Sequence, residues 1–183
     1  MAPKRGEVME NYLQLVKQAK RGNADAFASL YAEVYQSMYH FALYTLKNRS
    51  DAEDAVSEAV TDAFATIEKL RVEEAFRGWI FRILSNKCKD KLREYMQKNE
   101  ELKEDIPEPE RGRGIAEDLE VRGVFFALED EERLIISMHL FAGYKSREIA
   151  AILHMNENTV RSKESRGLKK MAAKLGNEKE EIS

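Results

Sequence analysis

Short polar and basic side chains recur at helical spacing near the carboxyl end of the chain, in a pattern suited to binding duplex DNA. Ser146 and Asn156 are residue types that commonly begin helices, and they predict two helices joined by a tight turn within residues 146–175. By the 3.6-residue period, one face of the second helix holds Asn158, Arg161, Ser162, Ser165, Arg166 and Lys169. This arrangement is typical of a helix-turn-helix, whose second helix presents such side chains to the major groove.

The charge of this stretch differs from that of the whole chain. Residues 145–175 have a net charge of +5, whereas the formal net charge of the chain is −3. A basic patch on an acidic protein indicates a local contact with a polyanion. An amphipathic helix that only faces solvent would also be charged, but two helix starts at this spacing favour DNA binding. The predicted inward side of the second helix holds Val160, Gly167, Leu168, Met171 and Leu175.

The composition favours an all-α protein. The chain of 183 residues is rich in the strong helix formers Ala, Leu, Glu, Lys and Arg, and it contains only three prolines. Its single cysteine, Cys88, excludes a disulfide framework and a multi-cysteine zinc site, and we expect neither metal nor cofactor. No apolar run is long enough to span a bilayer, so we expect a cytoplasmic protein without membrane insertion.

Four helices are predicted in the amino-terminal half, over residues 8–21, 23–47, 50–70 and 75–97. Ser50 and Glu53 have the spacing of a capping box at the start of the third helix. The exposed face of that helix is acidic, and the polar side of the fourth is mostly basic. Ordinary solvent-facing charge would also explain both faces, so the helical period alone leaves that interpretation open beside a binding function.

Residues 98–118 are predicted to form a flexible linker between two small helical domains, residues 1–97 and 119–183. Two of the three prolines lie in this segment, and residues 97–110 have a net charge of −4. Such a segment buries too little apolar area to offset its chain entropy, so we expect two separate modules. In the second module, helices at 119–128 and 131–142 are expected to pack beneath the helix-turn-helix.

Taken together, four stretches resemble the extracytoplasmic-function sigma factors of bacterial RNA polymerase. They are DAEDAVSEAV (51–60), FRGWIFRILSNKCKDKLR (76–93), SREIAAIL (146–153) and NTVRSKESRGLKKM (158–171). The resemblance covers nearly the whole chain, from about Asp25 to Leu175. Helix-turn-helix sequences like the last two occur in many regulators, but both halves in this order, with a charged linker between them, are specific.

The resemblance implies a transcription initiation factor that selects promoters and catalyses no reaction. It implies docking on the clamp coiled-coil of core RNA polymerase through Asp51, Asp54, Ser57 and Glu58. It implies binding of the melted minus-ten element through Arg71, Phe76, Arg82, Asn86, Lys87 and Lys91. The polar face of the helix-turn-helix would read the minus-thirty-five duplex, beside the polymerase flap. An anti-sigma factor is a further partner that the resemblance suggests.

Five positions depart from the pattern that is usual in these sigma factors. Ser57 and Val60 stand where Gln and Phe are common, and Val72 stands where Gly is common. His154 replaces the usual glycine in the turn of the helix-turn-helix, and histidine tolerates left-handed backbone better than most residues. Glu164 falls on the inward side of the second helix, where an apolar residue is expected.

Two other functions fit parts of the sequence. A dimeric helix-turn-helix repressor or activator would use the first domain for sensing or dimerisation, and it would bind a palindromic duplex without polymerase. A helical adaptor that binds only proteins would show no salt-dependent DNA binding. A sigma factor should instead bind isolated duplex weakly and become specific only with core polymerase.

Overall fold

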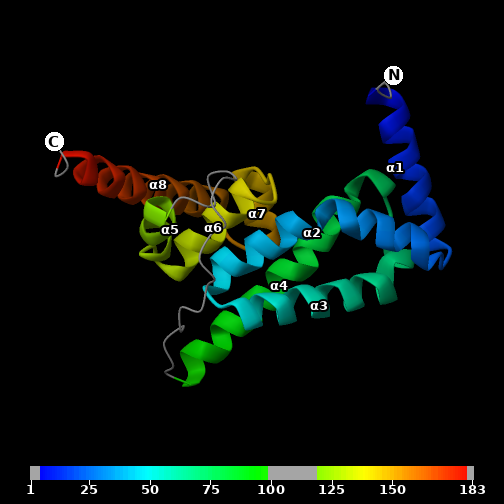
Figure 1. The fold of residues 1–183 in the computed structure, drawn as a ribbon, viewed down its shortest axis with the longest axis horizontal. Coiled ribbons are helices and arrows are strands. Elements are labelled where there is room, and N and C mark those ends of the chain that lie inside the picture. The colour runs from blue at the N-terminus through cyan, green and yellow to red at the C-terminus, as the bar shows by residue number, and fades with distance from the viewer. Residues whose placement is uncertain (1–4, 99–118, 181–183) are drawn as a thin grey trace.

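A computed structural model describes residues 5–98 and 119–180, in which the regular elements are helices (Figure 1). The predicted all-α fold is therefore confirmed. Apart from Lys98, the predicted linker lies outside the described residues. In chain order the elements are α1 (Arg5–Lys20), α2 (Ala24–Leu46), α3 (Arg49–Thr66), the short 3-10 helices η1 (Ile67–Lys69) and η2 (Glu73–Ala75), α4 (Phe76–Lys98), α5 (Leu119–Phe126), α6 (Asp130–Leu140), α7 (Ser146–Leu153) and α8 (Glu157–Glu180).

The acidic helix α3 begins slightly earlier than the sequence pattern predicts. Asn48 has extended backbone, and its side-chain oxygen accepts a hydrogen bond of 3.0 Å from the backbone N–H of Asp51. The predicted capping box of Ser50 and Glu53 is therefore wrong, because Asn48 already satisfies the free N–H group of the first turn. Glu53 forms an ion pair with Arg49 instead, at 2.8 Å.

The first domain packs α2 against α1, α3 and α4 around buried aromatic rings. Phe41, Phe76 and Phe81 are completely buried, and the rings of Phe41 and Phe81 meet edge to face with centroids 6.0 Å apart. Cys88 of α4 is also completely buried, and this burial raises the pKa of its thiol. The thiol therefore stays protonated at neutral pH and fits a packing role rather than a nucleophilic one.

In the second domain, α5 and α6 lie against the inward side of α8, as predicted. The helices approach each other closely at Gly167, which has no side chain. A Cβ atom at this position would lie 2.6 Å from Cδ1 of Ile136 and 3.5 Å from Cβ of Glu132, both on α6. Glycine is therefore favoured here by the spacing of α6 and α8 rather than by backbone conformation.

Replacement of Gly167 by valine should destabilise the second domain by about 1–3 kcal/mol, because Ile136 is fully buried and has little room to move. Thermal or urea unfolding followed by circular dichroism would measure this change. Gly123 of α5 is the matched control, since a Cβ atom there meets nothing within 4 Å. Gly123→Ala should instead stabilise by about 0.5–1 kcal/mol. Equal effects of both substitutions would contradict the close helix packing.

The two domains are in direct contact, contrary to the expectation of separate modules (Figure 1). Helix α2 packs on α6, and the buried side chains of both domains form one continuous cluster. The ring of Tyr44 lies 5.4 Å from that of Phe125, 5.6 Å from Phe126 and 5.1 Å from Phe141. The composition of the linker could not predict this contact, because it carries no information about how the two domains fit each other.

Candidate nucleic-acid and protein interfaces

Helices α7 and α8 form the predicted helix-turn-helix, and its turn depends on two polar residues. His154 ends α7 with left-handed backbone, at φ 54° and ψ 41°. It therefore adopts the conformation that a glycine usually supplies in this turn. Asn156 then accepts a hydrogen bond of 2.8 Å from the backbone N–H of Asn158 at the start of α8. The cap before α7 is Lys145 rather than Ser146, and the Lys145 N–H donates to Glu148 at 2.8 Å.

The outward face of α8 holds all of the predicted duplex-binding side chains, and each of them is exposed: Asn158, Arg161, Ser162, Ser165, Arg166 and Lys169. Val160 and Gly167 face inward, as expected. Leu168 does not, because its side chain is 46% exposed. The outward face is therefore polar and basic but includes one apolar residue, which is suited to contact with a thymine methyl group.

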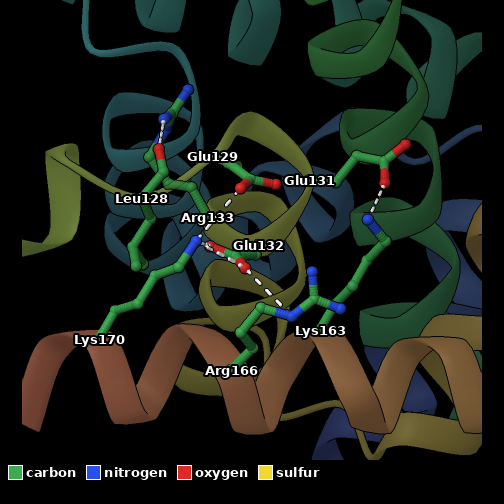
Figure 2. Close-up of polar contacts among 8 residues, drawn as sticks. All are labelled: Leu128, Glu129, Glu131, Glu132, Arg133, Lys163, Arg166 and Lys170. Atoms are coloured by element: carbon green, nitrogen blue, oxygen red, sulfur yellow. Dashed lines mark hydrogen bonds and ion pairs between the residues drawn. The ribbon is translucent and has the colours of Figure 1, made fainter.

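Acidic residues of α6 hold α8 in place from its inward side (Figure 2). Glu132 is completely buried and pairs with Lys170 at 2.8 Å, and this hydrogen bond raises the pKa of Lys170. Lys163 pairs with Glu131 at 2.7 Å. The Nε atom of Arg166 lies 3.9 Å from Glu132, but the side chain remains 55% exposed. Lys163 and Lys170 therefore serve helix packing, whereas Arg166 keeps an accessible guanidinium.

Glu164 has partners on the inward side of α8, where an apolar residue was expected. It accepts a hydrogen bond of 3.0 Å from the Ser146 hydroxyl, and its other oxygen lies 3.2 Å from Nδ1 of His139. These contacts join α6, α7 and α8. The residue that departs from the usual pattern thus links the three helices of this domain, and the hydroxyl of Ser146 serves this contact rather than capping.

The predicted polymerase-binding acids of α3 face the predicted phosphate-binding lysines of α4. Lys87 lies 2.8 Å from Asp62 and 3.4 Å from Glu58. These acidic contacts raise the pKa of Lys87. The packing of the two helices thus brings together side chains that were predicted to bind different partners, core polymerase for Glu58 and melted DNA for Lys87.

The next ion pair along α3 and α4 is less accessible. Lys91 pairs with Asp51 at 3.2 Å, and Asp51 also accepts a hydrogen bond from the Tyr95 hydroxyl. The Asp51 side chain is only 15% exposed, so it has a structural role within the domain. In contrast, Asp54, Ser57 and Glu58 are exposed, although Asp54 lies 3.9 Å from Lys91 and Glu58 lies 3.4 Å from Lys87. These three residues form the accessible part of the predicted polymerase contact.

The residues predicted to bind a melted strand divide into accessible and inaccessible ones. Arg71, Arg82 and Asn86 are exposed. Phe76 is completely buried, and its ring packs against those of Tyr12, Phe27 and Trp79. The prediction that Phe76 contacts DNA is therefore wrong, because the first residue of α4 points into the core.

A cavity of about 610 Å³ lies between the two domains, beside this strand-binding region. Arg71, Trp79 and Arg82 line it from the first domain, and Tyr144 and Ile152 line it from the second. No pattern in the sequence predicted that these residues of the two domains would lie together. Within residues 5–98 and 119–180, no helix is both long and apolar enough to cross a membrane, and no cluster of His, Cys, Asp or Glu could hold a metal ion.

Two protein-family descriptions match the chain, one in each domain. Sigma-70 region 2 matches residues 30–97, which contain α3 and nearly all of α4. Sigma-70, region 4, matches residues 127–171, which contain the helix-turn-helix. The two matches together cover more than half of the chain.

Individual relatives span most of the chain. It is 30% identical over 146 residues to RNA polymerase sigma factor SigV of Bacillus subtilis, covering 78% of this chain and 87% of that protein. It is 27% identical over 156 residues to ECF RNA polymerase sigma factor SigM of Mycobacterium tuberculosis, covering 85% of this chain and 80% of that protein.

Two solved structures share the fold. Sigma factor RpoE of Bartonella quintana, in complex with the anti-sigma factor NepR, matches with a TM-score of 0.70 and 21% identity, over 82% of this chain and 96% of that one. CnrH, in complex with the cytosolic domain of CnrY, matches with a TM-score of 0.65 and 21% identity, over 91% and 98%. At this level of identity the similarity shows the fold alone.

Proposed function

The chain belongs to the sigma-70 family as an extracytoplasmic-function sigma factor of RNA polymerase, and we propose which of its surfaces contact the polymerase and the promoter. The observation that carries the proposal is the exposed polar face of α8, which lies within the matched region 4. Sigma factors are non-catalytic subunits, so the function of this chain lies in its binding surfaces. The alternative of a dimeric regulator is not favoured, because sigma regions match both domains.

In the proposed upstream contact, α8 enters the major groove of the minus-thirty-five duplex. Asn158, Ser162 and Ser165 offer short hydrogen-bonding groups to base edges, and Arg166 offers a planar guanidinium that can bind a guanine with two hydrogen bonds. Arg161 and Lys169 lie on the same exposed face and would neutralise phosphates. The first helix, α7, would cross the DNA backbone.

The proposed contact with the melted minus-ten strand uses Arg71, Arg82 and Asn86, which are exposed on the first domain. A single strand needs cations for its phosphates and hydrogen-bonding groups for its unstacked bases, and these three side chains supply both. Lys87 and Lys91 were also predicted to bind phosphates. We propose that they mainly hold α4 to α3, because both are paired with acidic residues of that helix.

The salt dependence of single-strand binding should distinguish a phosphate contact, proposed for Arg82, from a contact between helices, proposed for Lys87. The two variants to compare are Arg82→Gln and Lys87→Gln. Arg82→Gln should reduce the slope of log affinity against log salt concentration by about 0.7, the value for one phosphate contact with a single strand. Lys87→Gln should leave the slope unchanged, because Lys87 is already neutralised by Asp62 and Glu58. Fluorescence anisotropy over a range of salt concentrations measures both slopes. A reduced slope for Lys87→Gln alone would reverse the assignment.

Asp54, Ser57 and Glu58 are the proposed contacts with the clamp coiled-coil of core polymerase. They lie on one face of α3, are exposed, and border Lys87 and Lys91 of α4. The flap would contact the second domain. A factor that works with polymerase must reach it in the cytoplasm, so we propose that location. We also propose an anti-sigma factor as a regulator, of the kind seen with RpoE.

Binding of duplex promoter DNA, measured with and without core polymerase, tests the proposed function. The chain alone should bind duplex weakly, with little preference for sequence, and addition of core should make binding specific. Tight binding of a palindromic duplex by a dimer in the absence of core would instead support an independent regulator.

A further inference from the structure

We propose that the buried carboxylate of Glu132 is a positioning residue for promoter recognition, because it attracts the Nε side of Arg166 and thereby orients the guanidinium that reads a base pair. The inference deepens the proposed upstream contact and rests on the assignment of Arg166 to a base edge. Glu132 itself would not touch DNA. It lies on α6, the helix that packs against the inward side of α8.

Helix α6 brings Glu132 to the border of the DNA-facing surface of α8. Lys163, Arg166 and Lys170 are spaced three and four residues apart, so they lie along one side of α8. Figure 2 shows their side chains extending from α8 toward acidic residues of α6. Among these three, Arg166 is the residue proposed to read a base, and its side chain is more than half exposed. Arg166 therefore borders both α6 and the outward face of α8.

The backbone on both sides of this contact is held in place. Gly167 follows Arg166, and a Cβ atom there would lie only 3.5 Å from Cβ of Glu132, so the two helices are in close contact at this point. On α6, the residue after Glu132 is Arg133, which is completely buried. Its Nε atom donates to the carbonyl of Thr45 in α2 at 3.1 Å. The position of the Glu132 carboxylate relative to α8 is therefore fixed by packing.

The charge of Glu132 is only partly balanced by its nearest partner. The ammonium of Lys170 lies 2.8 Å from one oxygen of Glu132 and 3.1 Å from the other. It also lies 3.2 Å from Glu129, so two carboxylates share one ammonium. Nε of Arg166 is 3.9 Å from Glu132, too far for a good hydrogen bond. Because Glu132 is completely buried, water screens its attraction for Arg166 less than at the surface.

Contact through Nε suits a guanidinium that reads a base. The two Nη groups at the other end form a fork that matches the O6 and N7 acceptors of guanine in the major groove. A side chain that is already oriented loses less conformational entropy when this fork binds. Glu132 would therefore increase discrimination at the base pair that Arg166 reads, although it makes no contact with that pair.

Transcription by the full chain with core polymerase tests this role, on promoter fragments in which every base of the upstream element is substituted in turn. Glu132→Gln removes the charge but keeps the side-chain length and an oxygen that can accept from Lys170. It is compared with Arg166→Ala and with the double variant. Glu131→Gln is the matched control, because this neighbouring acid of α6 pairs with Lys163 at 2.7 Å. Circular dichroism checks that each variant is folded.

Glu132→Gln should reduce discrimination about 3- to 10-fold at the base pair that Arg166→Ala affects, and leave the other positions unchanged. This size lies within the range of couplings between contacting residues. The double variant should match Arg166→Ala alone, because positioning has no effect without the guanidinium. Glu131→Gln should match the wild type. If Glu132→Gln does not fold, Glu132→Asp decides the question, since it keeps the charge but withdraws it from Arg166, and it should reduce discrimination at the same pair.

Three results would overturn the positioning role. Wild-type discrimination in folded Glu132→Gln would show that the charge does not orient Arg166. Equal weakening at every base pair would show that Glu132 only holds α8 in the fold. Additive effects of Glu132→Gln and Arg166→Ala would show that Glu132 does not act through Arg166. In all three cases, promoter selection by the wild type in the same assay would leave the proposed function standing, whereas its absence would refute that function as well.

Discussion

Reversal of both Asp54 and Glu58 to arginine should abolish detectable binding to core polymerase without unfolding the chain. Both side chains are more than half exposed, so their loss removes little packing, and their ion pairs with Lys91 and Lys87 are long and solvated and contribute little to stability. At a protein interface the change replaces two attractive contacts by two repulsive ones, and we expect a cost of about 3 kcal/mol or more, roughly a 100-fold loss of affinity. Titration of labelled chain with purified core polymerase measures this loss.

The control for this variant has the same change in net charge at another place on the first domain. Asp25 and Glu33 of α2 are exposed acids outside the proposed contact. Asp25→Arg with Glu33→Arg should keep nearly wild-type affinity for core. If the two double variants lose affinity equally, core polymerase responds to overall charge, and the assignment of Asp54 and Glu58 to the clamp is incorrect.

Arg166→Ala should weaken recognition at one base pair of the upstream element. A guanidinium that binds a base edge with two hydrogen bonds contributes about 1–3 kcal/mol of discrimination at that position. Arg166 is exposed, and Lys170 remains as the partner of buried Glu132, so the substitution should leave the fold intact. Transcription from promoters with every base substituted in turn would locate the affected pair.

Arg147→Ala provides the comparison for Arg166→Ala. Arg147 is an exposed residue of α7, the helix expected to cross the DNA backbone. Its loss should lower transcription from all promoters to a similar degree, because phosphate contacts carry no sequence information. A uniform loss for Arg166→Ala as well would identify Arg166 as a phosphate contact and leave base reading to other residues of α8.

The features of this protein that depend on short segments were predictable from the sequence. The helix-turn-helix follows from two helix starts and the 3.6-residue period. The left-handed backbone at His154 follows from its place in the turn. The exposure of Asn158, Ser162 and Ser165 follows from the same period, because the inward face of α8 is fixed by Val160 and Gly167.

Features that depend on contacts between distant segments were not predictable. The aromatic side chain of Phe76 and the carboxylate of Asp51 fit a binding role by type, but packing of α4 on its neighbours buries the first and pairs the second. Arg133 follows four consecutive acidic residues, a context typical of a surface charge, yet it is completely buried. Helical periodicity distinguishes inward from outward sides, but it does not reveal which partner an inward side chain meets.

Run-off transcription with purified core polymerase on a library of promoter fragments tests the central claim most directly. Core polymerase alone should start transcription without selecting particular fragments. Addition of this chain should produce transcripts from a defined subset that share two spaced sequence elements, one for each domain. If the start sites are the same with and without the chain, it does not direct promoter selection, and the proposed function is wrong.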